Sequence, residues 1–171
     1  MIEKNSAAKL SLPSDREILV VRDFEAPRAL LFDMWSKPEH VRRWYGCAAF
    51  TLPICEIDFR VGGSWRWVMH NPADETDHAM SGEYREIVRS ERISFTERYE
   101  PIAGSDHVCT LGFEERDGVT TQTQHFVYPS TQVRDGHLQA GMEGGMEETF
   151  ARIDALLASF APSHSHTDLS I

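Results

Sequence analysis

The last regular segment of the chain, residues 136–160, has the sequence pattern of an amphipathic helix. Its large apolar residues recur every three or four positions, namely Met142, Met146, Phe150, Ile153, Leu157 and Phe160. A stripe with this spacing lies along one face of a helix, and it has to be buried against another element. The rest of the chain therefore has to supply a surface that can cover one long helix.

The preceding segments have the pattern of strands. Apolar and polar residues alternate between residues 50 and 128, and turn-forming residues interrupt the alternation at regular intervals. Short connections between alternating segments are typical of an antiparallel sheet with one buried face. The pattern predicts a first strand over residues 16–24 and further strands over residues 50–60, 63–70, 78–88, 92–99, 107–115 and 119–128.

Two short helices are predicted between the first strand and the others. Pro27 suits the first turn of a helix that runs to about Trp35, and Pro38 suits the first turn of a second helix. Many consecutive strands form a sheet that twists and curls, and its concave face is the expected seat of the long helix. The sequence thus predicts an α+β fold in which a curved antiparallel sheet of about seven strands holds a long C-terminal helix.

Length and charge limit the classes of function. A chain of 171 residues is large enough for one domain, which we expect over residues 16–160, between a flexible arm at 1–15 and a flexible tail at 161–171. The formal net charge of −10 argues against binding of nucleic acid. No stretch approaches the roughly 20 apolar residues of a membrane helix. Together with three cysteines that form no CxxC pair, this predicts a cytoplasmic protein without membrane insertion.

Several short segments together resemble one known group of proteins. They are Arg22-Asp23-Phe24-Glu25-Ala26-Pro27-Arg28, Pro38-Glu39, Arg43-Trp44-Tyr45-Gly46, Gly62-Gly63-Ser64-Trp65-Arg66 and Gly82-Glu83-Tyr84. With these segments the chain resembles the helix-grip superfamily, also called SRPBCC, which includes START lipid-transfer domains, polyketide cyclases and the birch-pollen allergen. More narrowly, it resembles bacterial proteins similar to the C-terminal domain of the activator of heat-shock-protein-90 ATPase.

The resemblance implies a helix-grip fold and three classes of function. The first is a protein that binds a small hydrophobic or aromatic molecule in a cavity between the C-terminal helix and the sheet. The second is an enzyme of the cyclase, dehydratase or hydrolase type that uses the same cavity. The third is a regulator of the heat-shock-protein-90 ATPase, but the separate N-terminal domain of that co-chaperone has no counterpart here, so we expect no chaperone binding. We favour the first class, and the formation of a homodimer stays open.

The residues expected to contact a ligand lie on the sheet and at the start of the long helix. Trp65, Trp67 and Met69 share one face of a strand because side chains alternate along it. Two tryptophans at this spacing are typical of a core and also of the wall of an aromatic pocket. The expected ligand contacts are Trp65, Trp67, Met69, Tyr84, Phe95, His125, Met142 and Met146.

Three glycines in the first turns of the predicted helix, Gly141, Gly144 and Gly145, need a reason. Each costs about 1 kcal/mol of helix stability relative to alanine. One interpretation is a close approach of the helix to a strand, or a frayed or kinked helix start. The other is that the missing side chains leave room for a ligand, with Met142 and Met146 as deformable walls. The resemblance adds that Met146 stands where the family usually has tryptophan.

Catalytic chemistry has few candidates in this sequence. A histidine beside a carboxylate in an apolar cavity makes an acid–base pair, and His125 and Glu97 are the candidates for it. A hydrogen-bonded structural histidine is the simpler interpretation of the same pattern. The sequence contains no nucleophile, phosphate-binding or metal-binding motif, so we expect neither a cofactor nor a metal.

Overall fold

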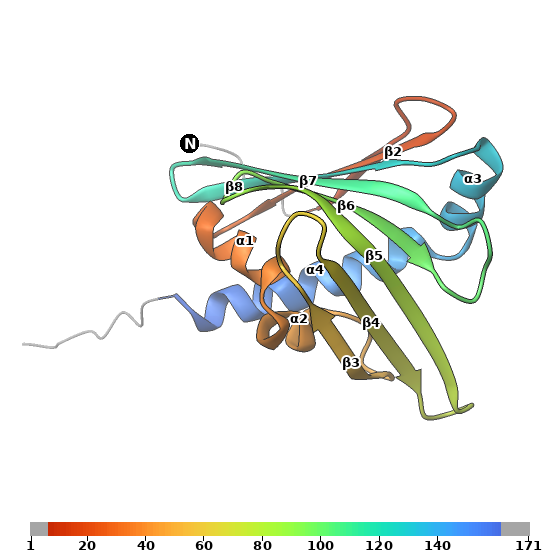
Figure 1. Ribbon diagram of the computed structural model, residues 1–171. Coiled ribbons are helices and arrows are strands. Elements are labelled where there is room, and N and C mark those ends of the chain that lie inside the picture. The colour runs from red at the N-terminus through yellow and green to blue at the C-terminus, as the bar shows by residue number, and fades with distance from the viewer. Residues whose placement is uncertain (1–6, 162–171) are drawn as a thin grey trace, which may run out of the picture.

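One curved antiparallel sheet carries helices on its concave side (Figure 1). The computed structural model describes residues 7–161, and their strands are β1 (Lys9–Ser11), β2 (Glu17–Phe24), β3 (Thr51–Ile57), β4 (Ser64–Asn71), β5 (Thr76–Val88), β6 (Arg92–Tyr99), β7 (His107–Arg116) and β8 (Val119–Val127). The helices are α1 (Arg28–Ser36), α2 (Pro38–Trp44), α3 (Thr131–Gln139) and α4 (Met142–Ser159). The predicted α+β architecture, with two short helices after the first long strand, is confirmed.

The sheet has eight strands in the described part of the chain, one more than the sequence predicted. Their order is β1-β2-β8-β7-β6-β5-β4-β3, and all neighbours are antiparallel. The additional strand is β1, whose Leu10 lies opposite Val20 of β2. The arm that we expected to be flexible therefore contains a strand, which escaped prediction because three residues are too few to show alternation. The rest of the predicted arm, residues 1–6, and residues 162–171 of the predicted tail lie outside the described residues.

The single helix predicted over residues 136–160 is in fact two helices. The break lies at Gly141, which has φ +85° and stands at the N-terminal end of α4. A residue in this left-handed conformation ends a helix, and glycine adopts it without steric cost. The first helix, α3, begins earlier than predicted because the Ser130 hydroxyl caps it by accepting a hydrogen bond from the N–H of Val133 at 3.2 Å.

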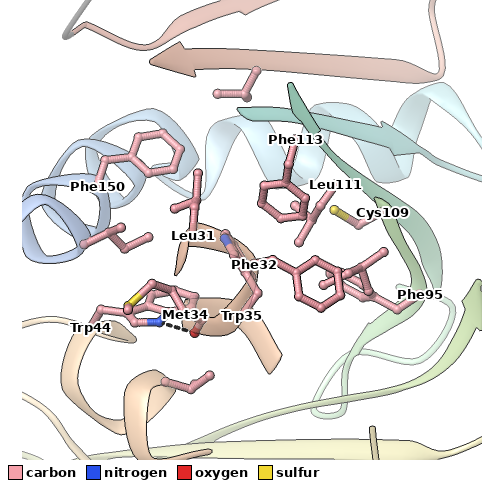
Figure 2. Close-up of a cluster of buried hydrophobic side chains, with 14 of the residues drawn as sticks. Leu31, Phe32, Met34, Trp35, Trp44, Phe95, Cys109, Leu111, Phe113 and Phe150 are labelled. Atoms are coloured by element: carbon pink, nitrogen blue, oxygen red, sulfur yellow. Dashed lines mark hydrogen bonds between the residues drawn. The ribbon is translucent and has the colours of Figure 1, made fainter. Parts of the chain in front are cut away.

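Helix α1 fills much of the space between the sheet and α4. Its residues Leu31, Phe32 and Met34 are almost completely buried. Figure 2 shows Leu31 between Phe150 of α4 and Phe113 of β7, and Met34 beside Trp44. The rings of Phe32 and Phe113 lie 5.7 Å apart, edge to face. The short helix α1 therefore lies between part of the sheet and the long helix and contributes its apolar side chains to the core.

Helix α4 is tied to the sheet by an apolar contact and by an ion pair. Phe150 packs edge-on against Phe24 of β2, with ring centroids 5.6 Å apart. Beside these rings, Arg22 of β2 donates two hydrogen bonds to the carboxylate of Asp154, at 2.8 and 2.6 Å. The Arg22 side chain is only 8% exposed, and its guanidinium lies 4.5 Å from the centroid of the Phe24 ring. The position of α4 is thus fixed by burial and by a directional bidentate bond.

Candidate functional site

A small cavity lies between the C-terminal end of α1 and the inner face of strands β4–β7. Its lining is aromatic and apolar and consists of Trp35, Trp65, Trp67, Tyr84, Ile93, Phe95 and Leu111. The cavity has a volume of about 10 Å³, which is about the space that one water molecule needs. A larger molecule enters only when some of the lining side chains move.

Trp67 is a lining residue whose fully buried polar atom lacks a partner. Its indole nitrogen is the one buried side-chain nitrogen or oxygen within residues 7–161 that makes no hydrogen bond. The other three tryptophans each donate to an oxygen at 2.7–3.2 Å, namely Trp35, Trp44 and Trp65. A buried donor without an acceptor costs about 1–3 kcal/mol of stability. An acceptor placed in the cavity would recover that free energy.

Gly82 leaves the space that the Trp65 indole occupies. Gly82 on β5 lies opposite Trp65 on β4. A Cβ on Gly82 would lie 1.7 Å from the carbonyl oxygen of Thr96 and 2.6 Å from Nε1 of Trp65, the two atoms that the Trp65 hydrogen bond joins. This wall of the cavity therefore requires glycine at position 82.

The structure divides the expected ligand contacts into two groups. The four that line the cavity are Trp65, Trp67, Tyr84 and Phe95. Met69 lies outside the lining and is half-buried beside Gly46, where an added Cβ would come 3.1 Å from the methionine sulfur. Met142 is buried in the main core and Met146 packs partly buried against it, so neither reaches the cavity. The cavity thus lies under α1 and not under the start of α4, where we had expected it.

His125 points to the outer face of the sheet. Its neighbours Gln124 and Phe126 are both buried, and Phe126 belongs to the core. Because side chains alternate along a strand, His125 lies on the opposite face. Nε2 of His125 is bonded there to the carboxylate of Glu17 on β2. The acid–base pair expected in the cavity is therefore not formed by this histidine.

Glu97, the second catalytic candidate, pairs with His107 of β7. Nε2 of His107 lies 2.9 Å from Oε1 of Glu97, and Nδ1 lies 2.9 Å from the carbonyl oxygen of Ser105. Both partners accept, so both ring nitrogens donate and the imidazole is positively charged. Burial opposes this charge, but the hydrogen bond and charge of Glu97 and the bond to Ser105 outweigh it and raise the pKa of His107. No ring nitrogen of His107 is left to take a proton from a substrate.

A second histidine, His137 of α3, lies with its ring centroid 5.5 Å from that of His107. Its Nδ1 is bonded to the hydroxyl of Tyr128. Burial lowers the pKa of His137; the negative charge of Glu97 opposes this shift, and the positive charge of His107 adds to it. Two neighbouring histidines therefore have pKa values that are shifted in opposite directions.

Part of this site could have been found in the sequence. Glu97 lies two residues from Phe95, and His107 lies two residues from Cys109, so each shares a strand face with that apolar residue. Alternation therefore places Glu97 and His107 on the inner face. The sequence does not contain the register that sets Glu97 opposite His107. It also gives no signal that Trp35, on the apolar side of a short helix, meets the aromatic residues of three strands.

The glycines at the start of α4 do not serve a close approach to a strand. A Cβ on Gly141, Gly144 or Gly145 would meet no atom within 4 Å. Gly141 is required for another reason: it has a positive φ and forms the junction between α3 and α4. The space beside Gly144 and Gly145 is open, and both residues are exposed. For Gly141 the structure therefore supports the interpretation of an irregular helix start.

An open antiparallel sheet that grips a long C-terminal helix in its concave face defines the helix-grip superfamily, and the structure places the chain in it. Within that superfamily, the chain belongs to the family described as Activator of Hsp90 ATPase homolog 1-like protein, whose sequence profile matches residues 25–158. A comparison with curated proteins gives no match. Among the helices of residues 7–161, none combines the length and the apolar character needed to cross a bilayer.

Solved structures with the same fold cover most of the chain. A protein from Rhodobacter sphaeroides has a TM-score of 0.83 at 20% identity, over 90% of this chain and 100% of that one. Protein Ms6760 from Mycobacterium smegmatis has a TM-score of 0.77 at 22% identity, over 92% and 99%. DynU16, a protein of the dynemicin biosynthetic locus, has a TM-score of 0.66 at 18% identity, over 88% of this chain and 49% of that one. At these identities the similarity shows the fold alone.

Proposed function

We propose that this protein binds a small aromatic molecule that carries a hydrogen-bond acceptor, at the cavity between α1 and strands β4–β7. The observation that carries the proposal is the indole N–H of Trp67, which is buried, borders the cavity and has no acceptor among the described residues. A carbonyl or ether oxygen of a ligand supplies the acceptor. The surrounding rings supply apolar burial and edge-to-face contacts, as in other small-molecule sites.

The ligand has to enlarge the site. A cavity of about 10 Å³ does not hold an aromatic ring, so binding requires that lining side chains move. The observed affinity is then reduced by the fraction of molecules that are open. We therefore expect modest affinity for a single-ring compound and a clear dependence on its polar group.

The test compares acetophenone with ethylbenzene, which are similar in size and differ in one carbonyl oxygen. We expect the native protein to bind acetophenone about tenfold more tightly, because a hydrogen bond to an otherwise unpaired buried donor contributes about 1–2 kcal/mol. Isothermal titration calorimetry and the rise in melting temperature measure both affinities. No binding of either compound, or equal binding of both, would contradict the proposal.

The variant Trp67→Phe connects this preference to the indole N–H. It removes the donor and keeps an aromatic ring, so we expect the preference for acetophenone to disappear. Trp44→Phe is the matched control, because Trp44 donates to the carbonyl of Met34 and does not line the cavity. The control has to keep the preference of the native protein.

The two other classes of function have no comparable support in the geometry. For an enzyme, His125 lies outside the cavity, and both nitrogens of His107 are already bonded to protein oxygens. For a regulator of heat-shock protein 90, the family description names an activity of its relatives, and no surface of this chain carries a specific argument for it. Ligand binding is therefore the function that we put forward.

A further inference from the structure

We infer that the side chain of Tyr45 occupies part of the ligand site in the free protein, and that the ligand which displaces it is a phenol. This inference rests on the proposed function, since it states what closes the site and what second polar group the ligand carries. Tyr45 directly follows α2, and so it reaches the site from the helical layer and not from the sheet.

The ring of Tyr45 packs against Trp67, the lining residue that carries the unpaired N–H, although Tyr45 itself is not part of the lining. Its centroid lies 4.7 Å from that of Trp67 and 5.9 Å from that of Trp44. On the sheet, the Trp67 ring also contacts that of Trp65 at 4.8 Å. Tyr45 thus completes a row of aromatic rings, but it is only half-buried. A planar ring from outside could take the same place on Trp67.

The hydroxyl of Tyr45 makes no hydrogen bond to any residue in 7–161. Burial raises the pKa of this phenol, and the negative charge of Glu97 raises it further. Glu97 uses Oε1 to bind His107, while its Oε2 has no partner among the described residues and the side chain is 18% exposed. Glu97 follows the lining residue Phe95 by two positions on β6, so both side chains lie on the same face of that strand. A carboxylate oxygen without a partner therefore lies next to a residue of the cavity wall.

A separate ligand is not restricted by the backbone, so its hydroxyl can form the hydrogen bond to Glu97 that the Tyr45 hydroxyl does not form. An aromatic ring on Trp67 with a hydroxyl directed at Oε2 of Glu97 is a phenol, and a hydrogen bond to a charged acceptor is stronger than one between neutral groups. The same argument disfavours an aromatic carboxylate, because its charge would be repelled by Glu97.

The backbone around Tyr45 is hydrogen-bonded to α4, while the side chain makes ring contacts with Trp44 and Trp67 and no hydrogen bond. The carbonyl of Tyr45 accepts from Arg152 of α4 at 3.5 Å, and the N–H of Ala48 donates to Glu148 at 3.1 Å. Gly46, with φ +92°, forms the turn between these two contacts. Rotation of the Tyr45 side chain away from Trp67 therefore breaks no hydrogen bond and gives up only the burial of one ring.

The experiment uses p-cresol, which is the side chain of tyrosine, and toluene, which is the same molecule without the hydroxyl. Tyr45→Ala empties the place on Trp67, and we expect it to bind p-cresol about tenfold more tightly than the native protein, where Tyr45 competes. In this variant p-cresol should bind about tenfold more tightly than toluene. Adding Glu97→Gln should reduce that preference. Calorimetry and the indole N–H signals in NMR spectra follow the binding.

Tyr45→Phe is the control that keeps the ring and removes only the unbonded hydroxyl. We expect it to bind p-cresol as weakly as the native protein and to melt at the same temperature. If Tyr45→Ala does not fold, as judged by circular dichroism, Tyr45→Val serves in its place.

Equal affinity of p-cresol for the native protein and the Tyr45 variant would overturn the inference. So would equal affinity of p-cresol and toluene for that variant. Either result leaves the acetophenone test on the native protein unaffected. Conversely, native protein that binds neither acetophenone nor ethylbenzene overturns the proposed function, whatever p-cresol does in the variant.

Discussion

At the scale of single residues, a few polar groups distinguish the inner face of this sheet from an ordinary apolar surface. Trp67 has a donor without an acceptor, and Glu97 has a carboxylate oxygen without a donor. His107 is held as a cation between two acceptors. The unpaired Trp67 donor costs free energy in the unliganded protein. Departures of this kind from a fully satisfied core are expected at functional sites.

The opposite pKa shifts of His107 and His137 predict two opposing contributions to the pH dependence of stability. The pKa of His107 is raised, so its contribution is complete below the unfolded value of 6.5 and is lost as the pH rises through the folded value. The pKa of His137 is lowered, so the unfolded state binds more protons and the free energy of unfolding decreases as the pH falls below 6.5.

Two asparagine variants separate these contributions. In His107→Asn, we expect the free energy of unfolding to decrease less as the pH rises above 6.5 than in the native protein. In His137→Asn, we expect it to decrease less as the pH falls below 6.5. Urea unfolding of the native protein and both variants between about pH 5 and 8 measures the slopes. If both variants changed the pH dependence in the same sense, the assignment of opposite shifts would be wrong.

At the scale of elements, α4 consists of two different halves. The second half carries Phe150, Ile153 and Leu157, which are buried in the core. The first half has two exposed glycines and follows a left-handed residue, so less of it is fixed by packing. The helix is therefore held at its second half, through Phe150 and the ion pair between Arg22 and Asp154, while its start depends on its junction with α3.

Removal of the ion pair tests this account of α4. Asp154→Asn leaves the buried Arg22 guanidinium without its bidentate carboxylate, and we expect the free energy of unfolding to fall by about 1–3 kcal/mol. Asp106→Asn is the matched control, because Asp106 also forms a bidentate pair, with Arg98, but both side chains are more than half exposed. We expect no measurable change from the control. Equal effects in urea unfolding would show that burial of Arg22 adds nothing.

At the scale of the whole molecule, the two edges of the sheet are poorly suited to pairing with a second copy. One edge strand, β1, has only three residues, and the other, β3, contains Pro53, which has no backbone N–H to donate. The large apolar side chains exposed among the described residues are few, and all but Val127 of β8 lie outside helices and strands; they are Leu12, Val61, Ile102, Val127 and Phe160.

We therefore predict a monomer in solution. Size-exclusion chromatography with multi-angle light scattering should give the mass of one chain, 19.5 kDa, at micromolar and at near-millimolar concentrations. A dimer mass at the lower concentrations would contradict this prediction and would direct attention to a surface that the edges do not supply.

The amino-acid sequence by itself determined the approximate positions of the seven long strands and the two short helices, and which residues of a strand share a face. Alternation carries this information because successive side chains of a strand point to opposite faces. It placed Trp65, Trp67, Tyr84 and Phe95 on strands whose inner faces meet at the cavity. The resemblance to the helix-grip superfamily then supplied the arrangement of these elements.

Only the tertiary structure decided which inner-face residues meet and how much space remains between them. Strand register brings Glu97 to His107 and leaves His125 on the outer face beside Glu17. Packing of α1 against the sheet reduces the cavity to about 10 Å³, and the positive φ of Gly141 divides the last helix. These outcomes depend on contacts between residues far apart in the chain, and periodicity within one segment contains no information about them.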